Sequence, residues 1–336
     1  MFINNDKILI TGGSGFIGTN LIDLLLDKNY ILLNFDKSKP HKNSHEQFWH
    51  HGNLLSKSDI ENALYTFKPT VVIHLAARTD TLSDVLDDYI DNTKGTENLI
   101  SCLENIDFLR LVVITSTQYV YKSDDIPLPP NDTEYRPYTI YGQSKVITEQ
   151  LTRASNLRCS WTIVRPANIW GPWHLRYPQE LWRIIDKGLY VHPCQHKVIR
   201  TYGYVKNVAY QILQILESDS AKVDKKTFYL GDEPIDSYVW LNAISRNLRG
   251  KTILRAPGYL FTIPALVGDL LLKIGIPTPL YTARFKNMIE DYIAPTDITV
   301  TEFGVSHPSL EENVKETISW IQTEGKEIFE YWKNKS

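Results

Sequence analysis

Two side chains that could exchange a proton with a substrate lie four residues apart. Tyr141 and Lys145 belong to the segment Tyr-Gly-Gln-Ser-Lys, at the start of a helix predicted over residues 141–154. Residues four apart lie on one face of a helix, and a nearby ammonium lowers the pKa of a phenol because it stabilises the phenolate. Such a tyrosine can exchange a proton with an alcohol or ketone oxygen near neutral pH. Two surface residues on an exposed helix would show the same spacing, so the pair needs a second motif beside it.

A glycine-rich loop supplies that second motif. Residues 11–18 read Thr-Gly-Gly-Ser-Gly-Phe-Ile-Gly and stand between a short apolar strand and a helix. Gly12, Gly15 and Gly18 follow the spacing GxxGxxG, and Gly13 with the last two satisfies GxGxxG. A tight turn needs glycine, a pyrophosphate must approach bare backbone, and free N–H groups at a helix start attract anions. The loop therefore favours dinucleotide binding over a bare turn.

An acidic residue indicates which dinucleotide binds. Asp36 closes the second predicted strand, 18 residues after Gly18. A carboxylate there can accept a hydrogen bond from the ribose 2′-hydroxyl and repel a 2′-phosphate. Asp36 thus predicts NAD rather than NADP, although Lys37 and Lys39 stand beside it and weaken the distinction.

The elements that must position these residues alternate along the first half of the chain. Apolar runs that predict strands cover 7–11, 30–35, 71–75, 111–115 and 161–165, and predicted helices cover 20–28, 60–67, 93–103 and 141–154. Strands that are apolar throughout are typical of a parallel sheet covered on both faces. We expect an α/β fold, a Rossmann-type doubly wound parallel sheet with a smaller mixed C-terminal substrate lobe.

The alternation also predicts the domain limits. Residues 1–167, with a return segment of about 201–231, should form the NAD-binding domain. The substrate-binding lobe should take residues 168–200 and 232–330.

Composition excludes several classes of protein. The chain has 336 residues, 43% hydrophobic and 22% charged, with a net charge of −3. This is typical of a globular protein and carries no basic footprint for nucleic acid. The three cysteines are scattered without a CxxC pair, and the clustered histidines, His50-His51 and His41/His45, lack a carboxylate at ligand spacing. We therefore expect no disulfide framework, no metal site and a reducing cytoplasmic location.

Seven ordered motifs resemble the extended short-chain dehydrogenase/reductase family, which includes nucleotide-sugar epimerases, dehydratases and ketoreductases. The resemblance covers nearly the whole chain. The motifs are TGGSGFIG (11–18), HLAA (74–77), Asn92 in NTKGTENLI, TST (115–117) followed by Val120 and Tyr121, YGQSK (141–145), RPANIWGP (165–172) and Arg200 in RTYGYVKNVA.

The resemblance implies roles for individual residues. Thr117 would orient the sugar oxygen, Tyr141 would be the acid/base, and Lys145 would hold the ribose and tune Tyr141. The implied cofactor-binding residues are Gly12, Gly15, Phe16, Ile17, Gly18, Asp36, Asn53, Leu54, Leu75, Ala76, Ala77, Asn92, Tyr141, Lys145 and Pro166. The candidate substrate-binding residues are Arg78, Thr117, Asn168, Arg200 and Arg284.

Several of these residues have a structural alternative. Ser116 could be a strand-end hydroxyl bonded to backbone, with Thr117 the reactive one. Asn168 could cap a turn instead of contacting a diphosphate. Arg78 could form a salt bridge with Asp80 or Asp84, which is the favoured interpretation. Arg284 aligns only loosely with the family.

Departures from the family pattern narrow the activity. The dehydratases of this family carry an Asp-Glu pair after the catalytic Thr, whereas this chain has Gln118 and Tyr119, so a 4,6-dehydratase is not expected. Lys206-Asn207 replaces the usual acidic pair after the arginine strand, and Asn53 replaces the usual aspartate after the third strand.

The apolar segment 259–276 is open to two interpretations. It contains Pro264, Asp269 and Lys273, and it could be an amphipathic helix lying on a membrane surface. Its glycine and proline punctuation favours a core helix of the substrate lobe. No stable membrane insertion is expected from its length.

The leading hypothesis is an NAD-dependent 4-epimerase of a nucleotide-linked sugar. The alternative is an NAD(P)H-dependent nucleotide-sugar 4-ketoreductase, and a different class is a catalytically silent cofactor-binding regulator. The family also implies a homodimer built on the helices that end near Leu103 and begin at Tyr141. Leu99, Ile100, Val146, Ile147 and Leu151 supply apolar faces for it, which could equally pack inside one subunit.

Overall fold

The computed structural model describes residues 6–122, 133–276 and 278–334, and the chain divides into two compact units. Unit 1 comprises Met1–Ile169, Gly203–Asp232 and Pro295–Ser306; unit 2 comprises Trp170–Tyr202, Glu233–Ala294 and His307–Ser336. The segment Pro295–Ser306, which the sequence prediction placed in the substrate lobe, belongs to unit 1. It contains helix α11 (Asp297–Phe303), whose Phe303 ring lies 5.0 Å from that of Phe228.

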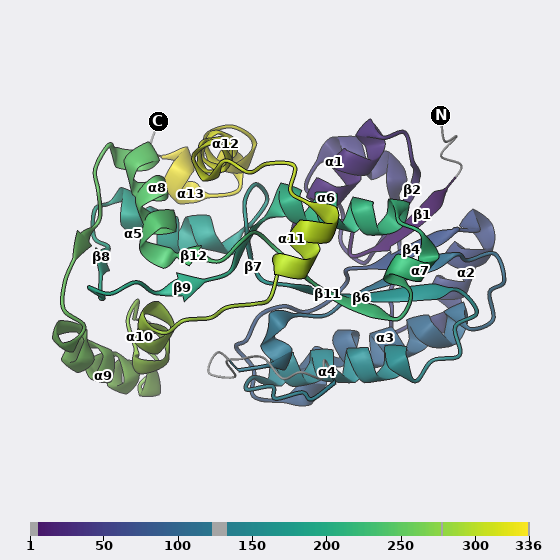
Figure 1. Cartoon of the computed structure of the whole chain (residues 1–336), viewed down its shortest axis with the longest axis horizontal. Coiled ribbons are helices and arrows are strands. Elements are labelled where there is room, and N and C mark those ends of the chain that lie inside the picture. Colours follow the sequence, from purple (N-terminus) through teal and green to yellow (C-terminus); the bar gives the residue numbers. More distant parts are fainter. Residues whose placement is uncertain (1–5, 123–132, 277, 335–336) are drawn as a thin grey trace. The chain divides into compact units, whose positions relative to one another are not determined.

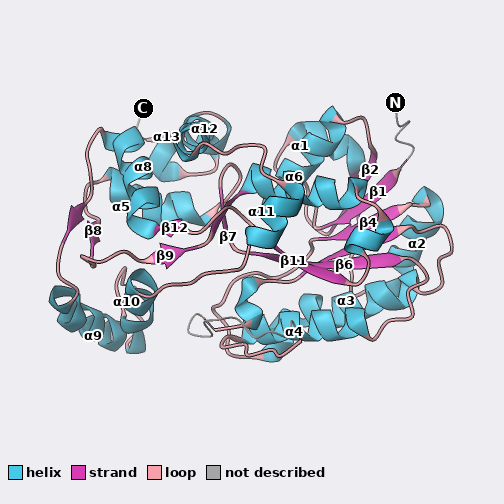
Figure 2. Cartoon of the chain, viewed as in Figure 1, coloured by secondary structure: helices cyan, strands magenta, loops and turns pink. Residues whose placement is uncertain are grey.

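Unit 1 is built on a seven-stranded parallel sheet with helices on both faces (Figures 1 and 2). The strand order is β11-β6-β5-β4-β1-β2-β3. The strands are β1 (Lys7–Thr11), β2 (Ile31–Asp36), β3 (Trp49–His51), β4 (Val71–His74), β5 (Leu111–Thr115), β6 (Ser160–Pro166) and β11 (Lys226–Leu230). The predicted α/β class and Rossmann-type doubly wound sheet are confirmed.

Alternate residues of the strands supply two separate apolar layers. Ile8 and Ile10 of β1 pack in the layer with helices α1 (Phe16–Asp27) and α6 (Val205–Glu217), whereas Leu9 packs in the layer on the opposite face. That second layer lies under α2 (Lys57–Phe67) and α3 (Ile90–Leu103), with α4 (Ile140–Arg153) beside α3. Side chains of a strand point alternately to its two faces, so an apolar strand needs cover on both.

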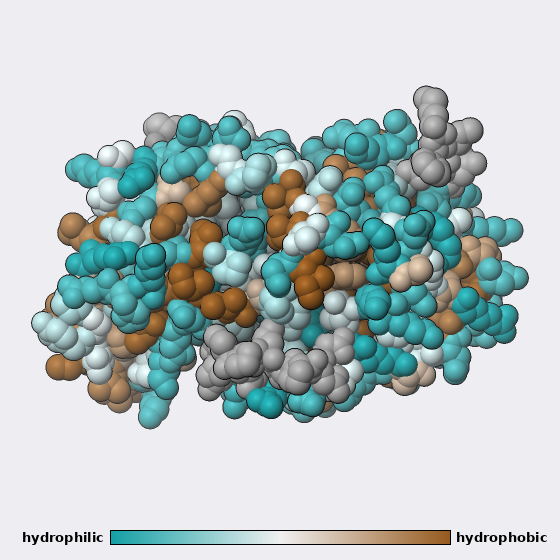
Figure 3. All heavy atoms as spheres, viewed as in Figure 1, coloured by the Kyte–Doolittle hydropathy of each residue, from teal (hydrophilic) through white to brown (hydrophobic). Residues whose placement is uncertain are grey.

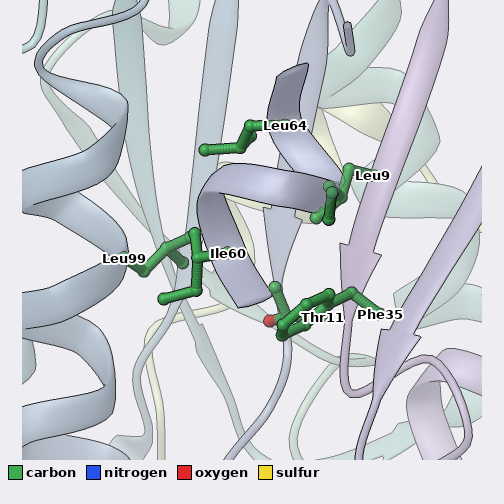
Figure 4. Close-up of a pocket in the computed structure, with 7 residues that line it drawn as sticks. Leu9, Thr11, Phe35, Ile60, Leu64 and Leu99 are labelled. Carbon is green, nitrogen blue, oxygen red and sulfur yellow. The ribbon is translucent and has the colours of Figure 1, made fainter. Parts of the chain in front are cut away.

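A small opening lies inside this second layer. Figure 4 shows Leu9, Phe35, Ile60, Leu64 and Leu99 around it, with Thr11 at its end. The space does not admit a water molecule. It is a packing gap of the core, and the functional site must be located from the strand ends instead.

The strand order turns at β1. The chain runs outward from β1 through β2 to β3, then returns to pair β4 with the other side of β1. The loops after β1 and β4 therefore leave the same edge of the sheet at the point where the order reverses. In open parallel sheets, ligands bind at this point, outside the carboxyl ends of the strands.

Unit 2 combines helices with short strand pairs. Its helices are α5 (Arg183–Asp186), α8 (Ser237–Arg249), α9 (Tyr259–Lys273), α10 (Thr282–Ile289), α12 (Leu310–Gln322) and α13 (Glu330–Lys333). β8 (Val191–His192) pairs with β13 (Leu254–Arg255), and β9 (Ile199–Arg200) pairs with β12 (Ile235–Asp236). Its core contains Trp170, Trp182 and Trp240, whose rings are buried and in contact.

The prediction that residues 259–276 form a core helix is wrong. The helix forms, as α9, but only Ala265 and Gly268 within it are buried. Burial of a long apolar helix requires cover on all sides, and the described part of unit 2 covers one side only. Among the described residues, no helix is both long and apolar enough to cross a membrane.

Candidate active site

The glycine loop at the carboxyl end of β1 is held by close backbone packing. Gly12 has φ 74°, and a Cβ there would lie 2.5 Å from the amide nitrogen of Ala76. A Cβ on Gly18 would lie 2.6 Å from the carbonyl oxygen of Gly12. Helix α1 begins with Gly15 as N-cap, without a side-chain cap and without an acidic residue in its first turn. A helix start of this kind, without a side-chain cap or an acid, suits a bound pyrophosphate.

The segment after β4 supports this loop from the neighbouring strand. The amide of Leu75 donates to the carbonyl oxygen of Thr11 over 2.9 Å. Ala76 approaches Gly12 so closely that no side chain fits between them. Ala77 continues the same segment, while Phe16 and Ile17 open α1 and pack partly against the core. Six predicted cofactor residues are therefore gathered at the turning point of the sheet.

Asp36 lies against the glycine loop. Its carboxylate accepts hydrogen bonds from the backbone N–H of Ser14 at 3.1 Å and of Ser38 at 2.8 Å. The Ser14 hydroxyl in turn donates to the Ser38 carbonyl at 2.8 Å. These bonds hold a negative charge beside the loop, where the sequence analysis expected one.

The two lysines that weakened the preference for NAD are engaged elsewhere. Lys37 forms an ion pair with Asp91. The ammonium of Lys39 lies 5.8 Å from the centre of the Trp49 ring. Neither lysine forms an ion pair with Asp36. The two lysines therefore do not compensate the negative charge of the Asp36 carboxylate.

Asn53 and Leu54 serve local structure. The Asn53 side-chain oxygen accepts from the amide of Leu55 at 2.9 Å, and its backbone N–H donates to Asp59 at 3.0 Å. Leu54 is buried in the core layer, where its Cβ would lie 3.2 Å from a Cβ on Gly95. Contacts of these two residues to an adenine remain a prediction.

A chain of buried polar groups runs from the glycine loop toward α4. The Thr11 hydroxyl and the Nδ1 of His74 lie 2.7 Å apart, and the Nε2 of His74 lies 3.1 Å from the Thr96 hydroxyl. Burial and the positive charge of Lys145 lower the pKa of His74 to about 3. The imidazole is therefore neutral, so one ring nitrogen donates a hydrogen bond and the other accepts one.

Asn92 continues this chain to the catalytic helix. Its amide nitrogen donates to the Ser144 hydroxyl at 2.9 Å, and Ser144 donates to the carbonyl oxygen of Tyr141 at 2.7 Å. Asn92 also bonds both backbone groups of Arg78, at 2.8 Å and 3.0 Å. Asn92 thus fixes the segment after β4 relative to α4. Sequence reasoning missed Ser144 and Thr96, whose only signal was a hydroxyl on the inner face of a helix.

Tyr141 is buried at the start of α4, and its phenol is hydrogen-bonded to the Thr117 side chain. Thr117 also caps the short helical turn Gln118–Val120, where it accepts from the amide of Tyr119 at 3.3 Å. The structure therefore brings Thr117 to Tyr141. The Ser116 hydroxyl is buried with no hydrogen-bond partner among the described residues.

Burial raises the pKa of Tyr141, and the hydrogen bond from Thr117 opposes the increase only in part. The sequence analysis expected Lys145 to lower this pKa. The direction here is the opposite, because a phenolate buried in protein loses more solvation than the neighbouring groups restore.

Lys145 is a buried cation whose nearest acid is already paired. Its side chain is 1% exposed, and burial lowers its pKa to about 8, opposed by the charge of Glu149. Glu149 lies one turn further along α4 and is bound by Arg165 through two hydrogen bonds of 2.8 Å and 2.7 Å. Both members of that pair are fully buried. Among the described residues, Lys145 has no ion-pair partner, which leaves its ammonium for a ligand hydroxyl.

Arg78 is held by acids of its own segment. Its guanidinium donates to Asp80 at 2.8 Å and to the carbonyl of Asp88 at 3.0 Å, and it lies 5.1 Å from the centre of the Tyr89 ring. The structural alternative for Arg78 is thus present, with Asp80 as its partner.

The remaining candidates lie at the end of β6 or in unit 2. Pro166 is the last residue of β6, and Asn168 begins β7 (Asn168–Trp170). In unit 2, Arg200 donates to the carbonyl oxygen of Glu290 at 3.0 Å, and Arg284 forms an ion pair with Glu180 at 3.1 Å. Roles of these residues in substrate binding remain predictions.

The residues of unit 1 fit a nicotinamide dinucleotide. The glycine loop leaves bare backbone at the start of α1, where a pyrophosphate would bind. Asp36 supplies a carboxylate beside this loop for the ribose, and Lys145 supplies a buried ammonium. No group of three or more potential metal ligands occurs among the residues that the structure describes.

Comparison with known proteins identifies the fold, and a family model matches the larger part of the chain. Residues 8–231 match the NAD dependent epimerase/dehydratase family. The chain is 19% identical to UDP-glucuronic acid 4-epimerase from Bacillus cereus, a structure in complex with UDP-glucuronic acid and NAD. The TM-score is 0.72, over 96% of this chain and 100% of that one. At this identity the likeness shows the fold.

Two curated relatives are similar over a shorter span. GDP-6-deoxy-D-talose 4-dehydrogenase from Aggregatibacter actinomycetemcomitans is 31% identical over 167 residues, 49% of this chain and 53% of its own. N-acetyl-alpha-D-glucosaminyl-diphospho-ditrans,octacis-undecaprenol 4-epimerase from Escherichia coli O157:H7 is 27% identical over 209 residues, 61% of each chain. The chain thus spans between half and three fifths of these relatives' lengths.

Proposed function

The chain belongs to the NAD dependent epimerase/dehydratase family, and on that premise we propose that it is an NAD-dependent 4-epimerase of a nucleotide-linked sugar. The observation that carries the proposal is the arrangement in unit 1 of Thr117 against the Tyr141 phenol, one helical turn from the buried ammonium of Lys145. A protein that only bound the cofactor would not need Thr117 and Tyr141 hydrogen-bonded in its interior.

The chain's own groups perform the proton chemistry of this proposal. Thr117 orients the C4 oxygen of the sugar by hydrogen bonding, and Tyr141 takes the C4 hydroxyl proton as the C4–H bond breaks. Bound NAD supplies the hydride acceptor. Tyr141 returns the proton to the same oxygen after the opposite face of the carbonyl carbon has been reduced, so no net oxidation occurs. Lys145 donates to the ribose, and its positive charge would offset part of the penalty that burial places on the Tyr141 phenolate.

The alternative is a C4 ketoreductase or dehydrogenase, which would consume cofactor at each turnover. The GDP-6-deoxy-D-talose 4-dehydrogenase relative supports this alternative, since that protein acts at C4 with net redox by its name. Asp36 beside the glycine loop supports the epimerase, because a carboxylate that repels a 2′-phosphate suits tightly held NAD. Gln118 and Tyr119, at the positions of the dehydratase acids, argue against elimination of water.

Two classes of group could carry the sugar: a nucleoside diphosphate or a polyprenyl diphosphate. Nucleotide sugars and the undecaprenol-linked sugar of the Escherichia coli relative share a sugar joined to a diphosphate. A substrate panel should therefore include UDP- and GDP-hexoses and one polyprenyl-diphosphate sugar in detergent.

The experiment that separates these activities follows the reduced-nicotinamide absorbance of the purified protein while the panel is added. Transient reduction, with the C4 epimer formed and no net change in cofactor, supports the epimerase. Stoichiometric consumption of cofactor would establish the redox alternative instead. Absence of any reaction with every panel member would contradict both.

We further propose a homodimer through α3 and α4. The structure buries Leu99, Leu103 and Val146 within one chain, where α3 packs on α4, and leaves Ile147 and Leu151 half-buried. These last two supply the surface for a symmetric contact. Light scattering tests the proposal: a dimer mass is expected, reduced to one subunit by Leu151→Glu. A single-subunit mass of the unmodified protein at high concentration would rule the dimer out.

A further inference from the structure

Helix α9 turns a continuous apolar stripe toward solvent. Tyr259, Ile263, Leu266, Leu270 and Ile274 are spaced by three or four residues, so they lie on one side of the helix. Each is 58–73% exposed. Leu260, Val267, Leu272 and Ile276 widen the stripe. Figure 3 shows apolar residues at the surface where Figure 1 places α9. Exposed apolar patches of this extent are rare on globular proteins unless something binds them.

The opposite side of α9 is fixed against α10, so the stripe cannot be hidden by rotation of the helix. Gly268 lies so close to the carbonyl oxygen of Leu280 that a Cβ would overlap it. Asp269 accepts hydrogen bonds from both the amide and the hydroxyl of Thr282, the first residue of α10. The Phe261 ring stacks near that of Phe285 in α10. One side of α9 therefore packs on the rest of unit 2. The other side is apolar and exposed, so it is suited to contact with a second apolar medium.

The charges around the stripe are predominantly positive. Between residues 251 and 291 five basic residues stand against three acids, Asp269, Glu290 and Asp291, and Asp269 is bonded to Thr282. Lys251, Lys273 and Lys286 are exposed in the same segment. The two arginines of the segment are ion-paired: Arg255 with Asp236, and Arg284 with Glu180. A chain of net charge −3 thus carries a local excess of basic residues beside the exposed α9 stripe.

We propose that α9 docks this protein on the surface of an anionic lipid bilayer. The 15-residue helix is about 22 Å long and lies in the plane of the headgroups, with its stripe among the upper acyl chains. Lys273 and Lys286 contact the anionic headgroups, each adding attraction that falls with salt. The helix lies on the bilayer and does not cross it. The inference concerns a binding surface of unit 2 and does not depend on the proposed reaction.

A second copy of the chain fits this surface less well. A symmetric contact would bury the stripe of one copy on that of the other, with the lysines of both copies at the rim. Like charges at the rim of an apolar contact weaken it, whereas an anionic surface neutralises them.

Flotation of the full-length protein with lipid vesicles tests the proposal. Binding is expected to vesicles of phosphatidylglycerol mixed with phosphatidylcholine, weaker binding to phosphatidylcholine alone, and loss of the difference at high salt. Ile263→Asp combined with Leu270→Asp should lower the partition coefficient by about tenfold or more, because each loses the burial of an aliphatic side chain. Lys273→Gln should lower it by about fivefold on anionic vesicles only.

Ile298→Asp is the matched control, since Ile298 is 64% exposed on α11 of unit 1. It should leave vesicle binding unchanged. NAD binding by each variant reports that unit 1 remains folded, and Lys273→Gln keeps the test valid should the double variant misfold. Three results would overturn the proposal: no binding to anionic vesicles, equal binding by the stripe and control variants, or concentration-dependent self-association that the stripe variant abolishes.

Discussion

The interior of unit 1 around α4 and the exterior of unit 2 along α9 depart from the usual distribution of residues in opposite ways. At α4, the hydroxyls, the neutral imidazole of His74 and the ammonium of Lys145 are buried. At α9, a stripe of aliphatic side chains is exposed. Buried polar groups and exposed apolar patches are the informative exceptions in a folded protein.

The two exceptions differ in how the chain compensates them. The chain of polar groups from Thr11 through His74 and Asn92 to Tyr141 is hydrogen-bonded, whereas the buried Thr115 and Ser116 hydroxyls have no partner among the described residues. Lys145 is the member without an ion-pair partner among the described residues, because Arg165 takes Glu149. The α9 stripe has no such compensation within the described residues. In each region, the uncompensated part is the part that a ligand or a surface would complete.

The largest effect expected in the polar interior comes from the acid/base. Tyr141→Phe keeps the ring and removes the hydroxyl, so turnover should fall by about two to four orders of magnitude. Cofactor binding should survive. Steady-state kinetics and NAD titration measure the two quantities, and Tyr65→Phe, on the exposed side of α2, is the matched control. Near-normal turnover of Tyr141→Phe would remove Tyr141 from the mechanism.

This part of the site was also the part that the sequence predicted best. Short motifs at strand ends, such as the glycine loop and the Tyr-Lys pair, are fixed by backbone geometry that leaves a local pattern. The His74–Thr96–Asn92–Ser144 chain was not predicted, since it joins residues from three segments whose contacts depend on the packed sheet. The exposure of α9 was predicted wrongly, because apolar periodicity is the same whether a helix faces a core or an external surface.

A second test asks whether the buried cation costs stability. The pKa of Lys145 lies at about 8, below its ordinary 10.5, so the unfolded chain binds more protons between these values. Stability therefore rises with pH across that window, and the full penalty applies below pH 8. Lys145→Met should stabilise the free protein by about 1–3 kcal/mol at pH 7, and the gain should shrink toward pH 10.

Urea unfolding at the two pH values measures this gain. Lys315→Met removes the same charge from an exposed position of α12 and should show neither the gain nor its pH dependence. A destabilised Lys145→Met protein at pH 7 would mean that Lys145 is compensated in the fold, and the contrast with α9 would then rest on the exterior alone.

Cofactor choice offers a smaller effect at the edge of the same interior. Asp36→Ala should shift the ratio of NADP to NAD affinity toward NADP by about tenfold, because the carboxylate that repels a 2′-phosphate is gone. Both affinities should also weaken, since Asp36 bonds the Ser14 amide of the glycine loop. The ratio is the diagnostic quantity, measured by fluorescence titration beside Asp27→Ala at the exposed end of α1. A preference of the unmodified protein for NADP would contradict the role of Asp36.

The smallest effect is expected on the apolar exterior. It is the change in the free energy of unfolding when an exposed isoleucine of α9 is shortened, set against the same change at a buried isoleucine. Ile263 in α9 is 73% exposed, and Ile244 in α8 is fully buried in the same unit. Ile263→Ala should change the free energy of unfolding by no more than about 0.5 kcal/mol, since the side chain packs on little and alanine is the better helix former. Ile244→Ala removes the same atoms and should cost about 2–5 kcal/mol. Urea unfolding of both variants without lipid gives the two values. A cost of Ile263→Ala close to that of Ile244→Ala would show that another part of the protein covers α9 in solution, and the stripe would then belong to the folding of this chain instead of to an external surface.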